Sequence, residues 1–505
     1  MGRIGLLYFL AGVFGGFLCS PHVEAASDQS SLFPEKLVHL DFKGAPLSIA
    51  YMESVFPLLR AMGASGLLVE YEDMFPYSGA LRNLTARNHF SPDDIKRLLD
   101  AADSNNLTVI PLVQTFGHLE FVLKLPDYIT MREDPENPQA LCPSFSLSNI
   151  IVRDMLRQVA HLHKDRISHI HIGSDEVFVI GECSRCKARM FANNWTTDDL
   201  FLDHVHTITA FTRSLNLQPI MWDDMFRKID IDVLRTKNLT KDTDIMLWSY
   251  RNVGEGEADL IEKYSQANFA GIWVASAFKG VAGPSEQMPQ YTLHLNNNID
   301  WLKVASSLEN KVKLRGIALT GWSRFDHFGS LCELFPVGIP VLALCLKHLS
   351  TGSHDARALE DIRELLRCNR PIPLASPEDA ALMWCGYPGA MTFVAVQRLD
   401  QFERKRLSIE STSYYKGFLT PMNLKHNFSS PALVRDAVVK LPAAMDLLDT
   451  VLENIQHLKN VCDQFTLKEW IETYWQPQKD WGQALQTVAE KLLYHKTFPR
   501  RPLYN

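Results

Sequence analysis

Asp175 and Glu176 are adjacent carboxylates that directly follow the run HIHIGS at residues 169–174. A carboxylic acid whose pKa is raised by an enclosed or charge-crowded environment can donate a proton to a glycosidic oxygen. An ionised Asp175 would favour the protonated form of Glu176 in this way. The pair is equally compatible with a cap at the start of a helix, so the pattern alone leaves both interpretations open.

The two carboxylates enter one cleft only if the backbone changes direction beside them. Successive side chains of a strand point to opposite faces, so a strand continuing through both would separate them. Gly173 permits a bulge or a strand end just before the pair. We therefore expect the strand to end at Asp175.

A second catalytic acid is not evident across the expected cleft. A retaining glycosidase with a protein nucleophile needs one about 5 Å from the first, yet residues 273–279 (WVASAFK) contain none. Substrate-assisted cleavage avoids this need, because the sugar's own acetamido group attacks the anomeric carbon. A proton donor and a carboxylate that orients the N–H then suffice, and this chemistry requires no metal or organic cofactor. A protein nucleophile at Glu72 or Asp73 is the alternative.

Elements that position these residues alternate along the chain as strand and helix, which is typical of parallel strands joined by helical crossovers. The expected strands are residues 37–42, 66–71, 108–114, 169–174, 218–223, 243–249, 271–277 and 315–322. Helices are expected at 48–62, 91–102, 152–163, 199–215, 257–267, 298–307 and 339–349. Eight such units predict an α/β fold, a (β/α)₈ TIM barrel over residues 34–351. A doubly wound open sheet is the alternative, but no phosphate-binding glycine turn follows the first strand.

The active site of such a barrel lies at the C-terminal ends of its strands. The polar and aromatic residues expected there are Asp41, Lys43, Glu70, Glu72, Asp73, Gln114, His118, Trp222, Asp223, Asp224, Trp248, Tyr250, Lys279, Trp322, Arg324, Asp326 and His327. Trp222, Trp248 and Trp322 would present flat apolar faces to the C–H side of a sugar, a composition that indicates a carbohydrate cleft. Filling the barrel interior is the competing interpretation of each tryptophan.

Residues 352–505 change to helical periodicity and predict a mainly helical C-terminal region. Helices are expected at 355–368, around 389–405, at 431–459 with a break at Pro442, and at 467–494. Nothing in this region suggests chemistry.

The N-terminus reads as a signal peptide, residues 1–25, in which an apolar run follows Arg3 and precedes small residues at a cleavage point. An uncleaved anchor is the alternative; no later segment is long and apolar enough to span a membrane. Sequons at Asn83, Asn106, Asn194, Asn238 and Asn427 agree with passage through the secretory pathway, to a secreted or lysosomal destination. A net charge of -7 gives no basic surface for nucleic acid, which is excluded as a partner.

Cysteines in that compartment are expected to form disulfides, although the sequence does not give their pairing. Cys183 and Cys186 form a C-x-x-C that suggests zinc, but no second Cys/His pair lies nearby in the sequence to complete a tetrahedral site. A local disulfide, or pairing of the two elsewhere, is the preferred interpretation, and no metal site is predicted.

Five segments together resemble glycoside hydrolase family 20, and they occur in the family's order across the whole expected barrel. They are residues 39–46 (HLDFKGAP), 70–77 (EYEDMFPY), 114–121 (QTFGHLEF), 171–177 (HIGSDEV) and 320–322 (TGW). The resemblance implies an exo-acting β-N-acetylhexosaminidase that removes a terminal GalNAc or GlcNAc from glycoconjugates.

The resemblance also implies individual roles. Glu176 is similar to the family's general acid/base, Asp175 to the residue that orients the acetamido group, and His118 to the histidine that supports the acid. The aromatic walls would be Trp222, Trp248 and Trp322, with Tyr250 binding the acetamido oxygen and Trp273 a weaker candidate. Many members bind the sugar hydroxyls with an arginine just before the first strand, where this chain has Lys36. Asp41, Lys43, Arg324 and Asp326 are possible substitutes, and Asp223 completes the expected substrate-binding set. The competing function is a sugar-binding barrel without turnover.

Overall fold

The computed structural model describes residues 32–236, 239–374 and 383–503, and these form a closed barrel with a helical arm. The expected signal peptide and the sequon at Asn238 lie outside these ranges. No helix within them is both long and apolar enough to cross a membrane.

Eight parallel strands make the barrel, and all eight expected strands are present. They are β1 (Glu35–Asp41), β2 (Gly66–Glu70), β3 (Thr108–Leu112), β6 (His169–His171), β7 (Gln218–Trp222), β8 (Asp244–Trp248), β9 (Gly271–Lys279) and β10 (Gly316–Gly321). Each pairs with its neighbours in chain order, and β1 closes the ring against β10 with Glu35 opposite Gly316. The predicted (β/α)₈ fold class is therefore confirmed.

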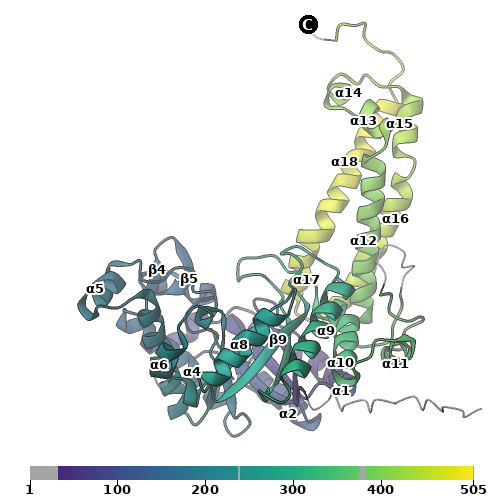
Figure 1. The fold of residues 1–505 in the computed structure, drawn as a ribbon. Coiled ribbons are helices and arrows are strands. Elements are labelled where there is room, and N and C mark those ends of the chain that lie inside the picture. The colour runs from purple at the N-terminus through teal and green to yellow at the C-terminus, as the bar shows by residue number, and fades with distance from the viewer. Residues whose placement is uncertain (1–31, 237–238, 375–382, 504–505) are drawn as a thin grey trace, which may run out of the picture.

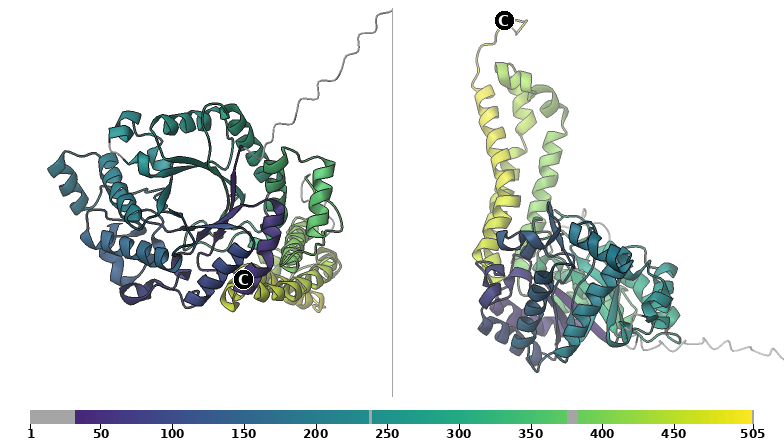
Figure 2. Two further views of the ribbon diagram at one scale, coloured as in Figure 1. Left: turned by 90° about the horizontal axis from the view of Figure 1, so that it is seen from below. Right: turned by 90° about the vertical axis from the view of Figure 1, so that its left-hand side faces the viewer.

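Helices surround the strands as an outer ring, seen along the barrel axis in Figure 2. They are α1 (Ile49–Met62), α2 (Pro92–Ser104), α4 (Ser146–Leu162), α6 (Thr197–Ser214), α7 (Ile231–Thr236), α8 (Glu255–Gln266), α9 (Tyr291–Leu308) and α10 (Phe335–Thr351). Capping residues in the sequence explain where some of these helices begin and end. Ser91 and Asp94 form a capping box at the start of α2, and Gly63 ends α1 in the left-handed conformation.

Two hydrophobic layers hold the barrel together. The larger lies between strands and helices, whereas a smaller cluster fills the barrel interior. The interior cluster contains Leu68, Met246, Trp222 and Trp273, with Trp248 and Trp322 packed against it. Tryptophans therefore both fill the barrel and border the space at its end.

Four short elements that the sequence did not predict lie on one side of the barrel. The connection between β3 and β6 contains α3 (Glu120–Leu123) and an antiparallel hairpin of β4 (Arg132–Asp134) and β5 (Asn137–Leu141). Helix α5 (Ser184–Asn193) follows β6 and lies near this hairpin, on the side opposite the helical arm in Figure 1.

The C-terminal region is helical, as predicted. It comprises α11 (Ala356–Leu366), α12 (Ala390–Glu410), α13 (Ser413–Phe418), α14 (Pro421–His426), α15 (Pro431–Val438), α16 (Leu441–Ile455), α17 (Gln464–Trp470) and α18 (Gln476–Leu493). A π-helical turn, Ile471–Trp475, joins α17 to α18. The arm formed by α12, α16 and α18 projects from the barrel, with α13 to α15 towards its tip (Figures 1 and 2). The expected break at Pro442 lies between α15 and α16, with Pro442 in the first turn of α16.

One disulfide is present among the described residues, between Cys368 and Cys385. Cys183 and Cys186, for which a disulfide was the preferred interpretation, are free thiols. Their sulfurs instead lie close to that of Cys142, a cysteine 41 residues away from Cys183 along the chain.

Candidate active site

A pocket of about 230 Å³ opens at the C-terminal ends of the barrel strands. It is lined by Lys43, Gln114, His118, Asp175, Glu176, Trp222, Trp248, Tyr250, Gly280, Val281, Trp322, Arg324 and Phe325. Nine of the thirteen predicted site residues are in this set: both catalytic candidates and Lys43, His118, Trp222, Trp248, Tyr250, Trp322 and Arg324. Segments far apart in sequence therefore meet where the barrel rule placed them.

The paired carboxylates enter the same pocket because the chain leaves the strand early. After β6 ends, Gly173, Ser174 and Glu176 adopt left-handed backbone conformations, with φ of 63°, 68° and 45°. This breaks the alternation that would have turned one carboxylate away. The Asp175 side chain is 10% exposed and that of Glu176 is 36% exposed. The inner carboxylate is thus enclosed, whereas the outer one is open to a ligand.

Two glycines allow this backbone path. A Cβ on Gly173 would lie 1.8 Å from Gln114 Oε1, and one on Gly117 would lie 2.2 Å from the Asp175 carbonyl oxygen. The loop after β3 therefore packs directly against the turn that carries the carboxylates. Left-handed residues other than glycine cost free energy and persist where surrounding contacts fix them, and Thr115 fixes this turn by bonding to Ser174 and to the carbonyl of Ile172.

His118 contacts both carboxylates. Its Nε2 lies 3.2 Å from Glu176 Oε2 and 3.5 Å from Asp175 Oδ2. Burial lowers the pKa of His118, but the charge of Asp175 and the hydrogen bond to Glu176 outweigh that effect and raise the pKa to about 10. The imidazole is therefore a cation shared between the two acids.

Asp175 keeps one acceptor atom unused. Its Oδ1 is buried and has no hydrogen-bond partner among the described residues. Burial raises the pKa of Asp175 to about 7, against the opposing charge of His118. A buried acceptor without a donor is costly in a folded protein unless a ligand supplies the donor.

Two residues outside the predicted set hold the backbone of Glu176. Asp224 Oδ2 accepts a hydrogen bond from the Glu176 amide at 2.8 Å, and Gln139 Nε2 donates to its carbonyl at 2.7 Å. Asp224 also accepts from Trp248 Nε1 at 3.1 Å. Asp224 was among the strand-tip residues in the sequence, whereas Gln139 lies in the hairpin that no pattern indicated.

Aromatic rings form the other walls of the pocket. The centroids of Trp222 and Trp322 are 6.3 Å apart, and Trp248 stacks on Tyr250 at 5.3 Å. Trp322 Nε1 donates to the Tyr250 hydroxyl at 3.3 Å, and Trp222 Nε1 is buried without a partner among the described residues. The walls thus combine apolar faces with polar groups that a sugar can bind.

A cluster of charges surrounds Lys43 beside the pocket. Its Nζ lies 3.4 Å from Asp41, 3.6 Å from Glu70 and 3.4 Å from Glu72. Burial lowers the pKa of Lys43, but these three charges outweigh it and raise the pKa well above its usual value. Burial likewise raises the pKa of Glu70, but Lys43 and His39 reverse this and lower it to about 2. Lys43 therefore carries a permanent positive charge at the pocket wall.

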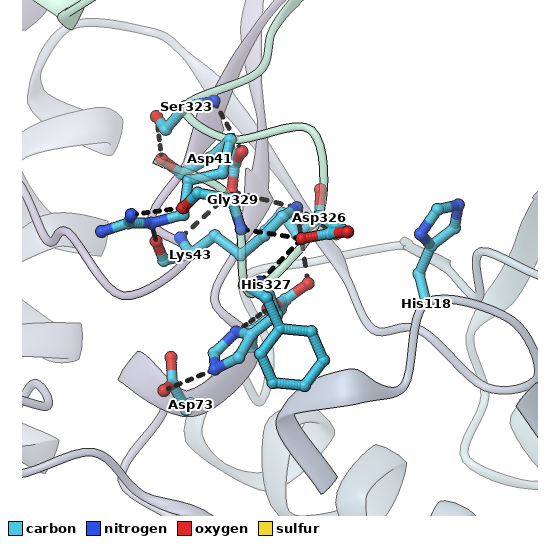
Figure 3. A network of polar contacts seen from close by, with 12 residues as sticks. Asp41, Lys43, Asp73, His118, Ser323, Asp326, His327 and Gly329 are labelled. Atoms are coloured by element: carbon cyan, nitrogen blue, oxygen red, sulfur yellow. Dashed lines mark hydrogen bonds and ion pairs between the residues drawn. The ribbon is translucent and has the colours of Figure 1, made fainter. Parts of the chain in front are cut away.

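The carboxylates considered as alternative nucleophiles belong to this network and are absent from the pocket lining. His327 Nδ1 lies 2.9 Å from Glu72 Oε2 and its Nε2 lies 3.5 Å from Asp73 Oδ2. These three residues could together hold a metal ion, but the Lys124 amine contacts both His327 and Asp73. Figure 3 shows Asp73, His327, Asp41 and Lys43 with the loop residues Ser323, Asp326 and Gly329. The amines of Lys43 and Lys124 therefore both lie among these carboxylates.

Arg324 lines the pocket but is largely committed to other protein groups. Its Nη1 and Nη2 form a bidentate pair with Glu469 of α17 at 2.5 and 2.6 Å, and its Nε donates to the Lys43 carbonyl at 2.9 Å. Helix α17 of the C-terminal region, for which the sequence suggested no chemistry, therefore reaches the edge of the pocket.

Four predicted substrate-binding residues do not line the pocket. Asp41 is buried and holds the Ser323 amide and Lys43. Asp223 is fully buried against Arg227 and Tyr264. Asp326 Oδ1 accepts from the amides of residues 328 and 329. These three support the walls instead of forming them.

Trp273 requires the largest correction. It is the third residue of β9 and faces the opposite, N-terminal end of the barrel, where it borders a separate cavity of about 660 Å³. Its Nε1 donates to Asp244 Oδ2 at 3.0 Å. Lys36 also lies near that end, in β1, and donates to the Phe33 carbonyl at 3.1 Å. Lys36 therefore does not line the pocket, whereas Lys43 does.

Comparisons with known proteins agree with this geometry. Residues 46–276 match the family described as "Glycosyl hydrolase family 20, catalytic domain". The chain is 36% identical to hexosaminidase D of Homo sapiens over 473 residues, covering 91% of this chain and 96% of that protein. It is 44% identical to hexosaminidase D of Bos taurus over 321 residues, covering 63% and 92% respectively.

A solved structure supports the fold independently. The chain aligns with the β-N-acetylhexosaminidase from Bacteroides fragilis with a TM-score of 0.51 at 14% sequence identity, covering 66% of this chain and 70% of that one. At this identity the likeness concerns the barrel architecture alone.

Proposed function

Because this chain belongs to glycoside hydrolase family 20 and is a β-N-acetylhexosaminidase, we propose that it removes terminal, non-reducing β-linked GalNAc or GlcNAc from glycoconjugates by substrate-assisted, retaining hydrolysis. The observation that carries this proposal is the joint entry of Asp175 and Glu176 into one aromatic-walled pocket, with Asp175 Oδ1 unused.

The size of the pocket supports action on a terminal sugar. Its volume of about 230 Å³ is below the range of about 300–1,000 Å³ typical of pockets for drug-sized ligands. One sugar ring suits this space better than an internal segment of a polysaccharide does. The aglycone would then lie outside, beside the more exposed Glu176.

The first step needs a proton and an oriented acetamido group. Asp175 Oδ1 accepts the acetamido N–H, which turns the acetamido oxygen towards the anomeric carbon. That oxygen forms a bond to the anomeric carbon as the glycosidic bond breaks, and Glu176 gives its proton to the departing oxygen. An oxazolinium intermediate and the free aglycone result, and the carboxylate of Asp175 stabilises the new positive charge.

The second step returns the proton. Glu176, now ionised, takes a proton from water while the water oxygen attacks the anomeric carbon and opens the oxazolinium ring. Two displacements leave the sugar with its original anomeric configuration. His118 supports both steps as a cation between the acids, and the Tyr250 hydroxyl binds the acetamido oxygen in this proposal.

Chromogenic substrates test the proposal. We expect turnover of an aryl β-N-acetylgalactosaminide or β-N-acetylglucosaminide between about pH 4 and about pH 7, and none of the corresponding β-galactoside and β-glucoside. A thiazoline, which resembles the oxazolinium, should inhibit with a dissociation constant well below the KM. Hydrolysis of all four substrates without thiazoline inhibition would instead indicate a protein nucleophile. Sugar binding without any turnover would indicate a barrel that only binds.

We also propose that the protein enters the secretory pathway. The leader pattern supports this, and the side chains at the sequons Asn83, Asn106 and Asn194 are exposed. The full-length chain expressed in mammalian cells should lose apparent mass on treatment with an N-glycosidase. Unchanged mobility together with an intact N-terminus in the cytosol would contradict this proposal.

A further inference from the structure

Three thiols and one buried carboxylate meet beside the barrel, outside the pocket. Cys142 follows β5, Cys183 and Cys186 lie at the start of α5, and Glu133 is the central residue of β4. Their ligand atoms all lie within 4.8 Å of one another, and three of the four residues are buried. Three segments that are separate in sequence thus direct metal-ligating atoms to one point.

The sulfur separations suit ligands of a common ion. Cys142 Sγ lies 3.3 Å from Cys183 Sγ and 3.5 Å from Cys186 Sγ, whereas a disulfide bond is about 2.05 Å long. Two thiolates on tetrahedral zinc, each about 2.3 Å from the metal, lie about 3.8 Å apart. Glu133 Oε2 is 3.2 Å from Cys186 Sγ and can supply a fourth ligand.

We propose that Cys142, Cys183, Cys186 and Glu133 bind one Zn²⁺ as a structural site. Thiolate and carboxylate ligands in a closed tetrahedral set are the chemistry that zinc takes in structural sites. The site could not be recognised from the sequence, because only the two cysteines of the C-x-x-C are close together along the chain. The missing ligands come from the hairpin, 41 and 50 residues before Cys183.

Neighbouring groups hold the ligands ready for a metal. The Glu133 Oε1 atom accepts hydrogen bonds from the amides of Glu182 and Cys183 at 2.7 and 3.0 Å, which fixes the carboxylate and leaves Oε2 facing the thiols. The Cys186 amide donates to Cys183 Sγ at 3.3 Å, so Cys183 caps α5 with its sulfur. A helix N-terminus stabilises a thiolate at this position.

Charge balance also agrees with a bound dication. Three thiolates and a carboxylate around Zn²⁺ carry a net negative charge, and Arg185 partly offsets it. Its Nε donates to Cys142 Sγ at 3.4 Å, and its guanidinium lies 4.6 Å from the centroid of the Phe145 ring. Supporting hydrogen bonds of this kind orient the ligands of metal sites.

This part of the molecule lacks a large core of its own. Its buried cluster is Cys142, Cys186 and Leu200, with a few half-buried neighbours, and it is separate from the main hydrophobic core. Small units that bury little apolar surface are commonly held by a metal or a disulfide. Zinc would join the hairpin, the loop after β6 and α5 in one step.

The site also bears on the proposed catalytic loop. Gln139, which bonds the Glu176 carbonyl, belongs to the same hairpin as Glu133, and Cys183 lies seven residues after Glu176. Zinc would therefore fix the loop from both sides and act as a positioning element. This effect on catalysis rests on the proposed function, whereas zinc binding itself does not.

Metal content and thiol state of the wild-type chain test the proposal directly. The full-length protein, expressed with zinc in the medium and purified without chelator, should contain one zinc per chain. Cys142, Cys183 and Cys186 should resist alkylation under native conditions and react after denaturation with a chelator. A disulfide between any two of them, or a zinc-free chain with three reactive thiols, would overturn the site.

Variants then assign the ligands. Cys186→Ser and Glu133→Gln should each lose most of the bound zinc, whereas Cys462→Ser, a buried thiol of the C-terminal region, should retain it. Should the ligand variants fail to fold, Co²⁺ exchange into wild type still decides, because tetrahedral thiolate-bound Co²⁺ absorbs strongly in the visible range. Zinc retained in both ligand variants, or no such absorption, would contradict the assignment.

Catalysis provides a separate readout. Removing zinc from the active wild-type enzyme should lower kcat and the melting temperature together, and added Zn²⁺ should restore both. Wild-type activity that is present but indifferent to zinc loss would refute the positioning role alone. Absence of activity in the zinc-loaded enzyme would instead count against the proposed function.

Discussion

The cavities at the two ends of the barrel differ in volume and also in how many unpartnered buried polar atoms line them. The N-terminal end has the larger cavity, about 660 Å³ against about 230 Å³ at the C-terminal end. Yet the smaller pocket is lined by buried polar atoms without partners on Asp175, Gln114 and Trp222, and the larger cavity is lined by none among the described residues. The lining of the smaller pocket also includes two non-glycine residues with left-handed backbone, His118 and Glu176, whereas the described lining of the larger cavity includes none.

This contrast indicates where a ligand is needed. Backbone strain and unpaired buried groups cost free energy and persist where function or surrounding structure requires them. At the N-terminal end the polar groups are satisfied, as Trp273 is by Asp244. The difference between the ends therefore predicts that substitutions at one end change catalysis, and at the other end only stability.

Glu176→Gln is expected to have the largest effect. It removes the proton donor while keeping the side chain's size, and loss of a general acid typically costs about 10²–10⁴-fold in rate. Steady-state kcat with an aryl N-acetylhexosaminide measures this loss. Glu182→Gln is the matched control, since it changes an exposed carboxylate of the same loop and should leave kcat unaltered. Comparable activity of the two variants would remove Glu176 from the mechanism.

Asp175→Asn should follow, with a loss of about 10²–10³-fold in kcat, the range for removing one group that stabilises the transition state. The amide keeps the shape of Asp175 but cannot offer two acceptor oxygens or a negative charge. KM should change less than kcat, and thiazoline inhibition should weaken in parallel. Asp232→Asn, at an exposed carboxylate of α7 outside the pocket, should preserve inhibition; weakening in both variants alike would count against a direct role for Asp175.

The same substitution at the two ends provides a third comparison. Trp222→Phe should lower kcat/KM about tenfold by removing part of the pocket wall, and its cost in stability should be limited to lost packing in the barrel interior, because no acceptor loses a donor. Trp273→Phe should leave kcat/KM within about twofold but cost about 1–3 kcal/mol in the free energy of unfolding, because an Asp244 oxygen loses its donor. Steady-state kinetics and thermal unfolding of both variants test this. A larger loss of kcat/KM in Trp273→Phe than in Trp222→Phe would refute the contrast between the two ends.

The smallest expected effect is thermodynamic and concerns His118. Its pKa is raised from 6.5 to about 10 in the folded chain, so its contribution to stability is complete below about pH 6.5 and is lost as pH rises through about 10. The melting-temperature advantage of wild type over His118→Gln should therefore shrink between these pH values, by the equivalent of about 1 kcal/mol or more. An advantage that grows with pH would show that the imidazole is neutral in the folded state.

Most of the barrel could be predicted because its strands are buried runs separated by amphipathic helices. The hairpin of β4 and β5 escaped prediction because its short segments, RED and NPQAL, show no alternation of apolar and polar residues. Gln139 and Glu133, which come from this hairpin, were missed for the same reason.

Within the site, errors arose where side-chain direction decides the role. Asp223 and Asp224 are adjacent at the end of β7, yet Asp223 is buried against Arg227, whereas Asp224 holds the Glu176 amide. Trp273 is the third residue of a nine-residue strand, so its side chain lies far from the end of the barrel that carries the candidate pocket. Neither distinction is contained in residue type or spacing.

The salt bridge between Arg324 and Glu469 has a practical consequence for handling the protein. A shortened version that stops after α10 would retain every residue lining the pocket, but would remove the counterion of Arg324, whose side chain is 7% exposed in the intact chain. The barrel therefore depends on the C-terminal region for the counterion of one pocket-lining residue. Helix α17 supports the edge of the pocket through Glu469. Removing it for crystallisation or expression would disturb a surface formed by residues more than a hundred positions earlier in the chain.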